Sequence, residues 1–157
     1  MLPDTLLDGM SVADRVETWC HRLTHPAPTD AATLVAVTGD QVLGFCSVGP
    51  ARDRDAPAGT GELWALYVDP DHWRGGVGWA LDDAAVVTLG ATGATRATLW
   101  VLTANARARS FYEARGWVAD GATRVDRREG PVPVDLAETR YARPVHPVHP
   151  VHPVRPG

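Results

Sequence analysis

The segment YVDPDHWRGGVGWAL, residues 67–81, constrains the fold more than any other part of the chain. It reads as the end of a buried strand, then a short turn, then glycines that open a helix. The first amides of a helix have no internal acceptor and lie at the positive end of the helix dipole. Because glycine lets the backbone approach a bulky anion without a side-chain clash, the segment predicts a binding site for a pyrophosphate group.

From the residues alone, this segment has a second interpretation that needs no bound phosphate. A glycine-rich turn before a helix is also typical of plain turn chemistry. Two familiar phosphate-binding motifs do not fit. No Gly-Lys-Ser or Gly-Lys-Thr follows the glycines, and the pattern G-x-G-x-x-G is not matched.

The rest of the chain predicts a mixture of short strands and helices. Hydrophobic spacing and turn residues indicate these elements: a helix at 11–24, a hairpin at 33–48 that turns at Gly39-Asp40, a polar loop at 50–60, strands at 62–68 and 96–102, helices at 76–89 and 105–115, and two or three strands within 117–142 with a turn at 129–131. The strand at 62–68 is apolar on both faces, so we expect it in the centre of a sheet.

Composition limits the partners and the compartment. The chain of 157 residues has a net charge of −4, which argues against a nucleic-acid partner. No apolar run approaches the length of a membrane span, and the first residues do not resemble a signal peptide. The two cysteines, Cys20 and Cys46, form neither a Cys-x-x-Cys motif nor a disulfide framework. We therefore expect a cytoplasmic protein that does not bind a membrane.

Residues 144–157 repeat Pro-Val-His, which predicts an extended, disordered tail outside a domain at 1–143. In a polyproline II conformation the histidines of such a repeat lie roughly 9 Å apart. One metal ion cannot take two ligands across that distance, so we expect no metal site. A weaker interpretation makes the tail a metal carrier.

The residues WRGGVG, after a strand that ends in Val-Asp-Pro, resemble the coenzyme A pyrophosphate loop of the GNAT N-acetyltransferases. The family pattern is Gln/Arg-x-x-Gly-x-Gly/Ala, and Gly76 and Gly78 fall on its two glycine positions. Trp73 stands where Gln or Arg is usual, and the neighbouring Arg74 can supply a polar side chain. The resemblance implies that the loop holding the pyrophosphate consists of Trp73, Arg74, Gly75, Gly76, Val77, Gly78 and Trp79.

Residues NARARSFYEARGW, 105–117, look like the second signature of the same family, Asn-x-x-Ala-x-x-Phe-Tyr-x-x-x-Gly-Phe/Trp. The resemblance implies that Asn105 contacts the pantetheine arm of the coenzyme. It also implies that the Tyr112 hydroxyl protonates the leaving thiolate. From the residues alone, Asn105 equally predicts a helix cap and Tyr112 a core aromatic residue.

Acetyl transfer to an amine needs a group that removes a proton, because an ammonium has no lone pair. Glu62 is the candidate, since it falls where histone-acetylating relatives in the family carry their catalytic glutamate. Its alternate-residue neighbours, Trp64 and Leu66, predict an apolar setting that would make the carboxylate a stronger base. The alternative is a solvated charge at the end of a strand.

The resemblance further implies a bulge in this strand that frees backbone groups near Leu66 and Val68. The Leu66 amide would then polarise the thioester carbonyl, and Leu66, Tyr67 and Val68 would line the pantetheine. The acetyl group would pass directly from thioester to amine. Cys46 is a poor candidate for an acyl carrier, because no base is spaced to activate it.

The beginning of the chain departs from the family. Relatives usually start with a strand and a helix before the helix that we predict at 11–24, and no β-like run precedes Ser11. We therefore expect the domain to lack that strand and helix. Such a domain would expose a sheet edge, which favours pairing into a homodimer.

The two signatures together predict an α+β fold: a GNAT-like mixed, mostly antiparallel sheet with helices on both faces, splayed between the strands at 62–68 and 96–102. The predicted function is an N-acetyltransferase that moves an acetyl group from acetyl-CoA to a primary amine of a small molecule or peptide. The alternative is a protein that binds coenzyme A for regulation, without catalysis.

Overall fold

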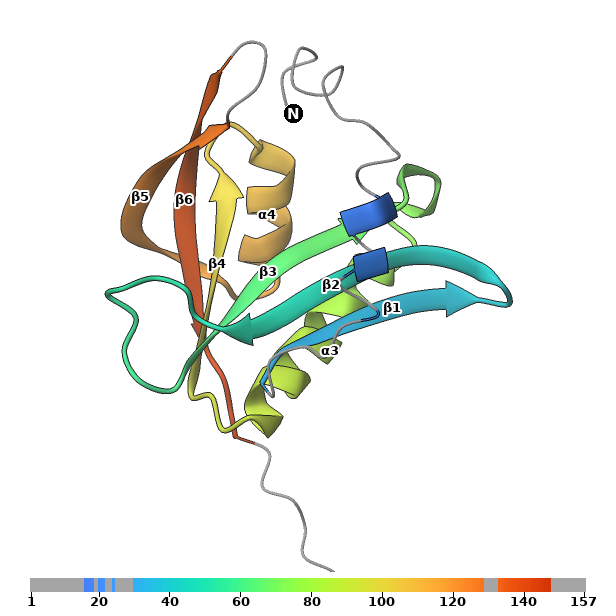
Figure 1. The fold of residues 1–157 in the computed structure, drawn as a ribbon, viewed down its shortest axis with the longest axis horizontal. Coiled ribbons are helices and arrows are strands. Elements are labelled where there is room, and N and C mark those ends of the chain that lie inside the picture. Colours follow the sequence, from blue (N-terminus) through green and yellow to red (C-terminus); the bar gives the residue numbers. More distant parts are fainter. Residues whose placement is uncertain (1–15, 19, 22–23, 25–29, 129–132, 148–157) are drawn as a thin grey trace, which may run out of the picture. The chain divides into compact units, whose positions relative to one another are not determined.

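The computed structural model describes residues 16–18, 20, 21, 24, 30–128 and 133–147. The elements are β1 (Ala32–Thr38), β2 (Gln41–Pro50), β3 (Thr60–Val68), the 3-10 helix η1 (Pro70–His72), α3 (Val77–Ala91), β4 (Arg96–Leu102), α4 (Ala106–Ala114), β5 (Val118–Arg128) and β6 (Val134–Pro144) (Figure 1). The strands follow the order β1-β2-β3-β4-β6-β5 in one sheet. The pairs β1–β2, β2–β3 and β5–β6 are antiparallel, and β3–β4 is parallel. The predicted α+β class with a mixed, mostly antiparallel sheet is confirmed.

The chain divides into two compact units. Of the described residues, the first unit holds 30–99 and 143–147, and the second holds 16–18, 20, 21, 24, 100–128 and 133–142. Within the first unit, the parallel pairing of β3 with β4 joins Thr60–Leu63 to Arg96–Leu99. Beyond Leu99 strand β4 belongs to the second unit, so the predicted splay between the two strands stays a prediction.

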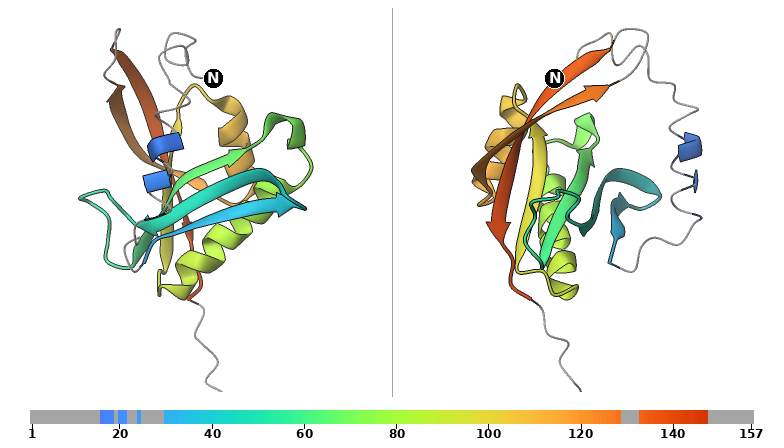
Figure 2. Two further views of the ribbon diagram at one scale, coloured as in Figure 1. Left: turned by 45° about the vertical axis from the view of Figure 1, so that its right-hand side comes forward. Right: turned by 60° about the vertical axis from the view of Figure 1, so that its left-hand side comes forward.

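In the first unit, helix α3 packs on one face of strands β1, β2 and β3 (Figures 1 and 2). Strands β1 and β2 form the predicted hairpin, with Gly39 in a left-handed conformation at the turn. The face of α3 toward the strands buries Leu81, Ala85 and Leu89. These residues recur at helical spacing, and their burial supplies the hydrophobic stabilisation of this unit.

A buried carboxylate lies beside this apolar face. Asp82 of α3 is completely buried, and its Oδ2 lies 3.5 Å from Nη1 of Arg143, near the end of β6. A buried carboxylate is costly unless a cation compensates its charge. The pair therefore ties the end of β6 to the helix.

The chain stays packed beyond the predicted domain end at residue 143. Pro144 is the last residue of β6, and Val145 is only 4% exposed. The Val145 amide donates a hydrogen bond to the Thr95 carbonyl at 2.9 Å. A Cβ at Gly90 would lie 2.6 Å from the His146 carbonyl oxygen, so only glycine lets α3 approach this closely. The first valine of the repeat therefore packs with the core of the first unit. Residues 148–157 lie outside the described part of the chain.

In the second unit, β5 and β6 agree with the two or three strands predicted within 117–142, and the predicted turn at 129–131 lies outside the described residues. The buried Tyr141 of β6 fixes α4, since its hydroxyl donates to Glu113 Oε1 at 2.7 Å and accepts from Arg109 Nε at 3.0 Å. The Arg109 Nη1 also donates to the Thr103 carbonyl after β4, at 3.3 Å. This network holds the helix that carries the second sequence signature.

The predicted helix at 11–24 is described only in part. Residues 16–18, 20, 21 and 24 are helical and exposed, and the Thr24 hydroxyl donates to the Cys20 carbonyl. The expected absence of a first strand and helix concerns residues 1–15, which are outside the described part. Among the described residues, no helix is long and apolar enough to cross a membrane.

A chain that stops after Arg143 should be less stable than one that stops after Pro147. Losing Val145 uncovers apolar surface and removes the hydrogen bond to Thr95, which together cost about 3 kcal/mol of unfolding free energy. The melting temperature should fall by about 10 °C. Thermal unfolding of both truncated chains, followed by circular dichroism, measures this. Equal melting temperatures would contradict the assignment of Val145 to the core.

Candidate functional site

The predicted pyrophosphate loop lies between the end of β3 and the start of α3. The Asp69 amide donates to the Leu43 carbonyl at 2.8 Å, which holds the end of β3 beside β2. Asp69 then caps η1, because its Oδ1 accepts from the Asp71 amide at 3.1 Å. The sequence Asp-Pro that ended the predicted strand thus starts a short turn that points the chain toward α3.

Two residues after this turn have a left-handed backbone. Arg74 has a φ of 63° and Gly76 has a φ of 85°. Gly75 between them lies close to earlier backbone, since a Cβ there would be 3.3 Å from the His72 carbonyl oxygen. For Arg74 this conformation costs roughly 1–2 kcal/mol, because its Cβ crowds the following carbonyl. This strain was not predicted from the sequence, because arginine is uncommon in a left-handed conformation.

The start of α3 has the properties of an anion site. Gly76 is the residue before the helix, and no side chain caps the helix at this end. The first turn carries no acidic residue. The first bond of the helix runs from the Ala80 amide to the Gly76 carbonyl, so the amides before Ala80 have no acceptor within the helix. A Cβ at Gly76 would meet no atom within 4 Å, which leaves space above these amides.

Trp73, which departs from the family pattern, links the loop to the strand. Its indole Nε1 donates a hydrogen bond to the Val68 carbonyl at 2.9 Å. This carbonyl is one of the backbone groups that we expected a bulge to free for the pantetheine. Sequence reasoning missed the contact, because it joins a loop side chain to strand backbone.

Strand β3 contains the predicted bulge. In the pairing with β2, Ser47 is opposite Ala65 and Val48 is opposite Leu63, so Trp64 is the extra residue. The bulge thus lies just before Leu66 and Val68, and the free backbone groups expected near those two residues stay a prediction. The Trp64 side chain lies over Gly49, where a Cβ would be 2.3 Å from the ring.

The three residues predicted to line the pantetheine end strand β3. Leu66 and Val68 are half-buried, whereas Tyr67 is 60% exposed. The Tyr67 ring lies 5.2 Å from the ring of Phe45 on β2. The exposed aromatic surface of Tyr67 is available to a ligand.

Glu62 has a different setting from the one predicted. Its carboxylate is buried, as expected, but it accepts three hydrogen bonds from Arg52. The expected apolar surroundings are wrong, and so is the alternative of a solvated charge. The sequence could not show this, because Arg52 comes from the polar loop before β3.

Asn105 and Tyr112 belong to the second unit, where each has a structural role. The Asn105 Oδ1 accepts from the Ala108 amide at 3.1 Å, which confirms the predicted helix cap. Tyr112 is buried, and its ring makes edge contacts with Phe111 at 5.1 Å and Trp117 at 6.2 Å. Both residues therefore fit the structural interpretation, and their roles toward the coenzyme stay predictions.

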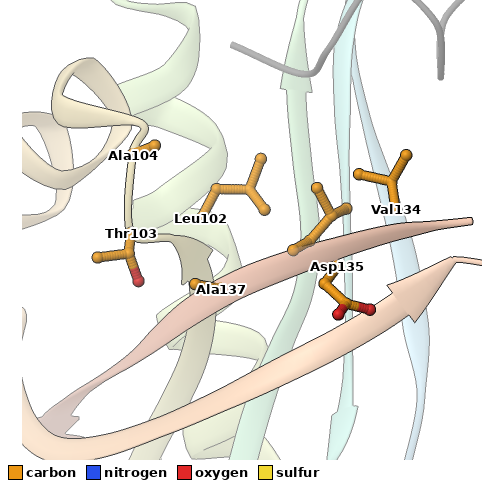
Figure 3. Close-up of a pocket in the computed structure, with 7 residues that line it drawn as sticks. Leu102, Thr103, Ala104, Val134, Asp135 and Ala137 are labelled. Atoms are coloured by element: carbon orange, nitrogen blue, oxygen red, sulfur yellow. The ribbon is translucent and has the colours of Figure 1, made fainter.

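A cavity of about 440 Å³ in the second unit lies where β4 ends and β6 begins. Figure 3 shows its mostly apolar lining, which includes Leu102 and Val134. Asp135 is the one ionisable residue of this lining, and its Oδ1 lies 3.7 Å from Arg127 Nη1. None of the predicted site residues lines this cavity.

Cys46, rejected above as an acyl carrier, is fully buried under α3. Burial, and next the neighbouring Asp82, raise the pKa of its thiol to about 11. The thiol is therefore neutral at physiological pH and is a poor nucleophile. The described residues hold no group of three or more His, Cys, Asp or Glu side chains that could bind one metal ion.

Comparison with known families agrees with both signatures. The model of the Acetyltransferase (GNAT) family matches residues 7–117, which include the pyrophosphate loop and the Asn105–Trp117 segment. The chain belongs to this family of acetyltransferases, which use acetyl-CoA as the co-substrate.

Two curated relatives are mycothiol acetyltransferases. The one from Beutenbergia cavernae is 47% identical over 60 residues, which are 38% of this chain and 20% of that protein. The one from Geodermatophilus obscurus is 34% identical over 89 residues, which are 55% of this chain and 29% of that protein. The chain thus spans less than a third of the length of either relative.

Solved structures share the fold. The ribosomal-protein-S18-alanine N-acetyltransferase from Escherichia coli has a TM-score of 0.63 at 18% identity, over 87% of this chain and 80% of its own. The yncA protein from Salmonella typhimurium, solved with its cofactor acetyl-CoA, has a TM-score of 0.63 at 19% identity, over 92% of this chain and 78% of its own. At these identities the likeness shows the fold alone.

Replacing Cys46 with alanine should remove a pH dependence of stability. The pKa of this thiol rises from its ordinary 9.0 to about 11 on folding, so the folded chain holds the proton more tightly. The protonated thiol therefore contributes to the stability of the folded chain. This stabilisation is complete below pH 9 and is lost as the pH rises toward 11. Urea unfolding of both chains between pH 8 and pH 11 measures the effect. The stability of the native chain should fall toward that of the variant, whereas a constant difference would contradict the raised pKa.

Proposed function

We propose that this chain transfers an acetyl group from acetyl-CoA to a primary amine. The observation that carries the proposal is the start of α3, which is uncapped, lacks acidic residues and follows a left-handed turn. Such a helix end favours a pyrophosphate through backbone amides and the helix dipole. Membership of the GNAT family supplies the rest of the argument.

In this proposal the amides of residues 74–79 hold the pyrophosphate. The pantetheine passes along Leu66, Tyr67 and Val68. Asn105 contributes through its Nδ2, since its Oδ1 already caps α4. The surroundings of these residues support the proposal, because they leave the Tyr67 ring exposed and the α3 amides without helical acceptors.

The chemical step is direct transfer. The amine nitrogen bonds to the thioester carbonyl carbon, and the carbon–sulfur bond then breaks. We assign Glu62 to take the proton that the amine nitrogen loses, directly or through water. The Leu66 amide stabilises the oxyanion, and the Tyr112 hydroxyl gives a proton to the departing sulfur.

The acceptor is a small-molecule or peptide amine in the cytoplasm. Both curated relatives carry the name mycothiol acetyltransferase, so amines related to mycothiol come first in a screen of acceptors. The rival function is binding of coenzyme A for regulation, without turnover. A screen that detects free thiol release from acetyl-CoA separates the two, since only the enzyme releases the thiol.

Gly76→Glu should abolish binding of acetyl-CoA, because it places bulk and negative charge over the α3 amides. Gly93→Glu is a matched control. Gly93 also has a left-handed backbone, with a φ of 87° and no atom within 4 Å of a built Cβ, but it follows the other end of α3. In titration calorimetry the affinity of Gly76→Glu for acetyl-CoA should fall by roughly tenfold or more, whereas Gly93→Glu should keep the native affinity. Equal affinities for both variants would contradict the site.

Tyr112→Phe should lower kcat by about a hundredfold, because it removes the proton donor and keeps the ring contacts with Phe111 and Trp117. The affinity for acetyl-CoA should stay native. Steady-state kinetics with the best acceptor of the screen, beside calorimetry, measures both. An unchanged kcat would leave Tyr112 with a core role only.

A further inference from the structure

The Glu62 carboxylate is buried in the first unit, with its side chain only 2% exposed. Its register partners are Gly49 on β2 and Thr98 on β4, and neither carries a charge. A carboxylate in such a place favours the protonated form unless a cation faces it. A protonated carboxyl group cannot accept a proton, so a base at this position needs a compensating charge.

Arg52 supplies this charge from the loop before β3. Its Nη2 donates to Glu62 Oε1 at 2.6 Å, and its Nε donates to the same oxygen at 3.2 Å. The Arg52 backbone amide donates to Oε2 at 2.8 Å. Each carboxylate oxygen can accept two hydrogen bonds. Oε1 therefore has its full number, and Oε2 can accept one more.

Neighbouring contacts hold the guanidinium in place. Its central carbon lies 5.1 Å from the centre of the Trp64 ring. The Trp64 indole donates to the Pro50 carbonyl at 3.2 Å, and Gly49 leaves room for the ring. The Ala51 amide donates to the Thr60 carbonyl at 3.1 Å, which closes the loop directly before Arg52. The backbone of Arg52 is thus held against β3, and its side chain, which is 59% exposed, contacts both Glu62 and Trp64.

We propose that Arg52 is the positioning residue for Glu62: it keeps the buried carboxylate charged and oriented, so that Oε2 is the oxygen that accepts the proton. The proposal rests on the function proposed above. It explains how a carboxylate away from solvent serves as a base. It also assigns a structural role to the bulge at Trp64, because the Trp64 ring lies beside the guanidinium of Arg52.

Kinetics tests the proposal with Arg52→Gln, Arg52→Lys and the control Arg54→Gln, which removes the same charge from an exposed position of the same loop. Arg52→Gln should lower kcat/KM for the amine by about tenfold to a hundredfold, and Arg52→Lys should restore part of this loss. Arg54→Gln should keep the native value. In a Glu62→Gln background, Arg52→Gln should have little further effect. An equal loss in both backgrounds would overturn the proposal, because Arg52 would then act on the fold and not through Glu62.

A second measurement does not need turnover. The melting temperature of Arg52→Gln should lie below that of the native chain, because the variant leaves the buried Glu62 carboxylate without its cation. In a Glu62→Gln background the same substitution should change the melting temperature little. An equal fall in both backgrounds would overturn the proposal. If the native chain binds acetyl-CoA but acetylates no amine, the proposed function fails, and this comparison still decides whether Arg52 acts through the carboxylate.

Discussion

The left-handed turn at Arg74 and Gly76 determines where α3 begins and which way its first amides point. Two contacts hold this turn against strand β3: the Asp69 cap on η1 and the hydrogen bond from the Trp73 indole to the Val68 carbonyl. These contacts offset the cost of a non-glycine residue in the left-handed region. Because the helix starts without a capping side chain, its amides keep their capacity for a ligand.

Buried carboxylates organise the rest of the first unit. Glu62 and Asp82 are both almost completely buried, and each meets an arginine that lies outside its own strand or helix. Leaving either carboxylate without its cation would cost several kcal/mol, so Arg52 draws its loop onto β3 and Arg143 draws the end of β6 onto α3. The chain contains no lysine, and the planar guanidinium suits paired hydrogen bonds to one carboxylate.

Local patterns in the sequence were enough to predict the elements, and distant contacts account for what they missed. Two β-rich runs joined at Gly39-Asp40 predicted the hairpin of β1 and β2, and Asn105 predicted the cap of α4, because these depend on neighbours along the chain. The setting of Glu62 depends on Arg52 from an irregular loop, which has no periodicity to read. The packing of Val145 was missed for the same reason, since its burial depends on its approach to Thr95 and the helix α3.

Trp73 changes how an anion would be held at this loop. The family pattern has Gln or Arg there, whereas the Trp73 indole uses its one N–H on the Val68 carbonyl. The side chain therefore strengthens the turn and gives no donor to a ligand. The positive potential must come from the backbone amides, the helix dipole and the exposed Arg74, in a chain of net charge −4. Binding of an anion at this loop would then depend mainly on the backbone conformation of residues 74–79, where Arg74 and Gly76 have a left-handed backbone.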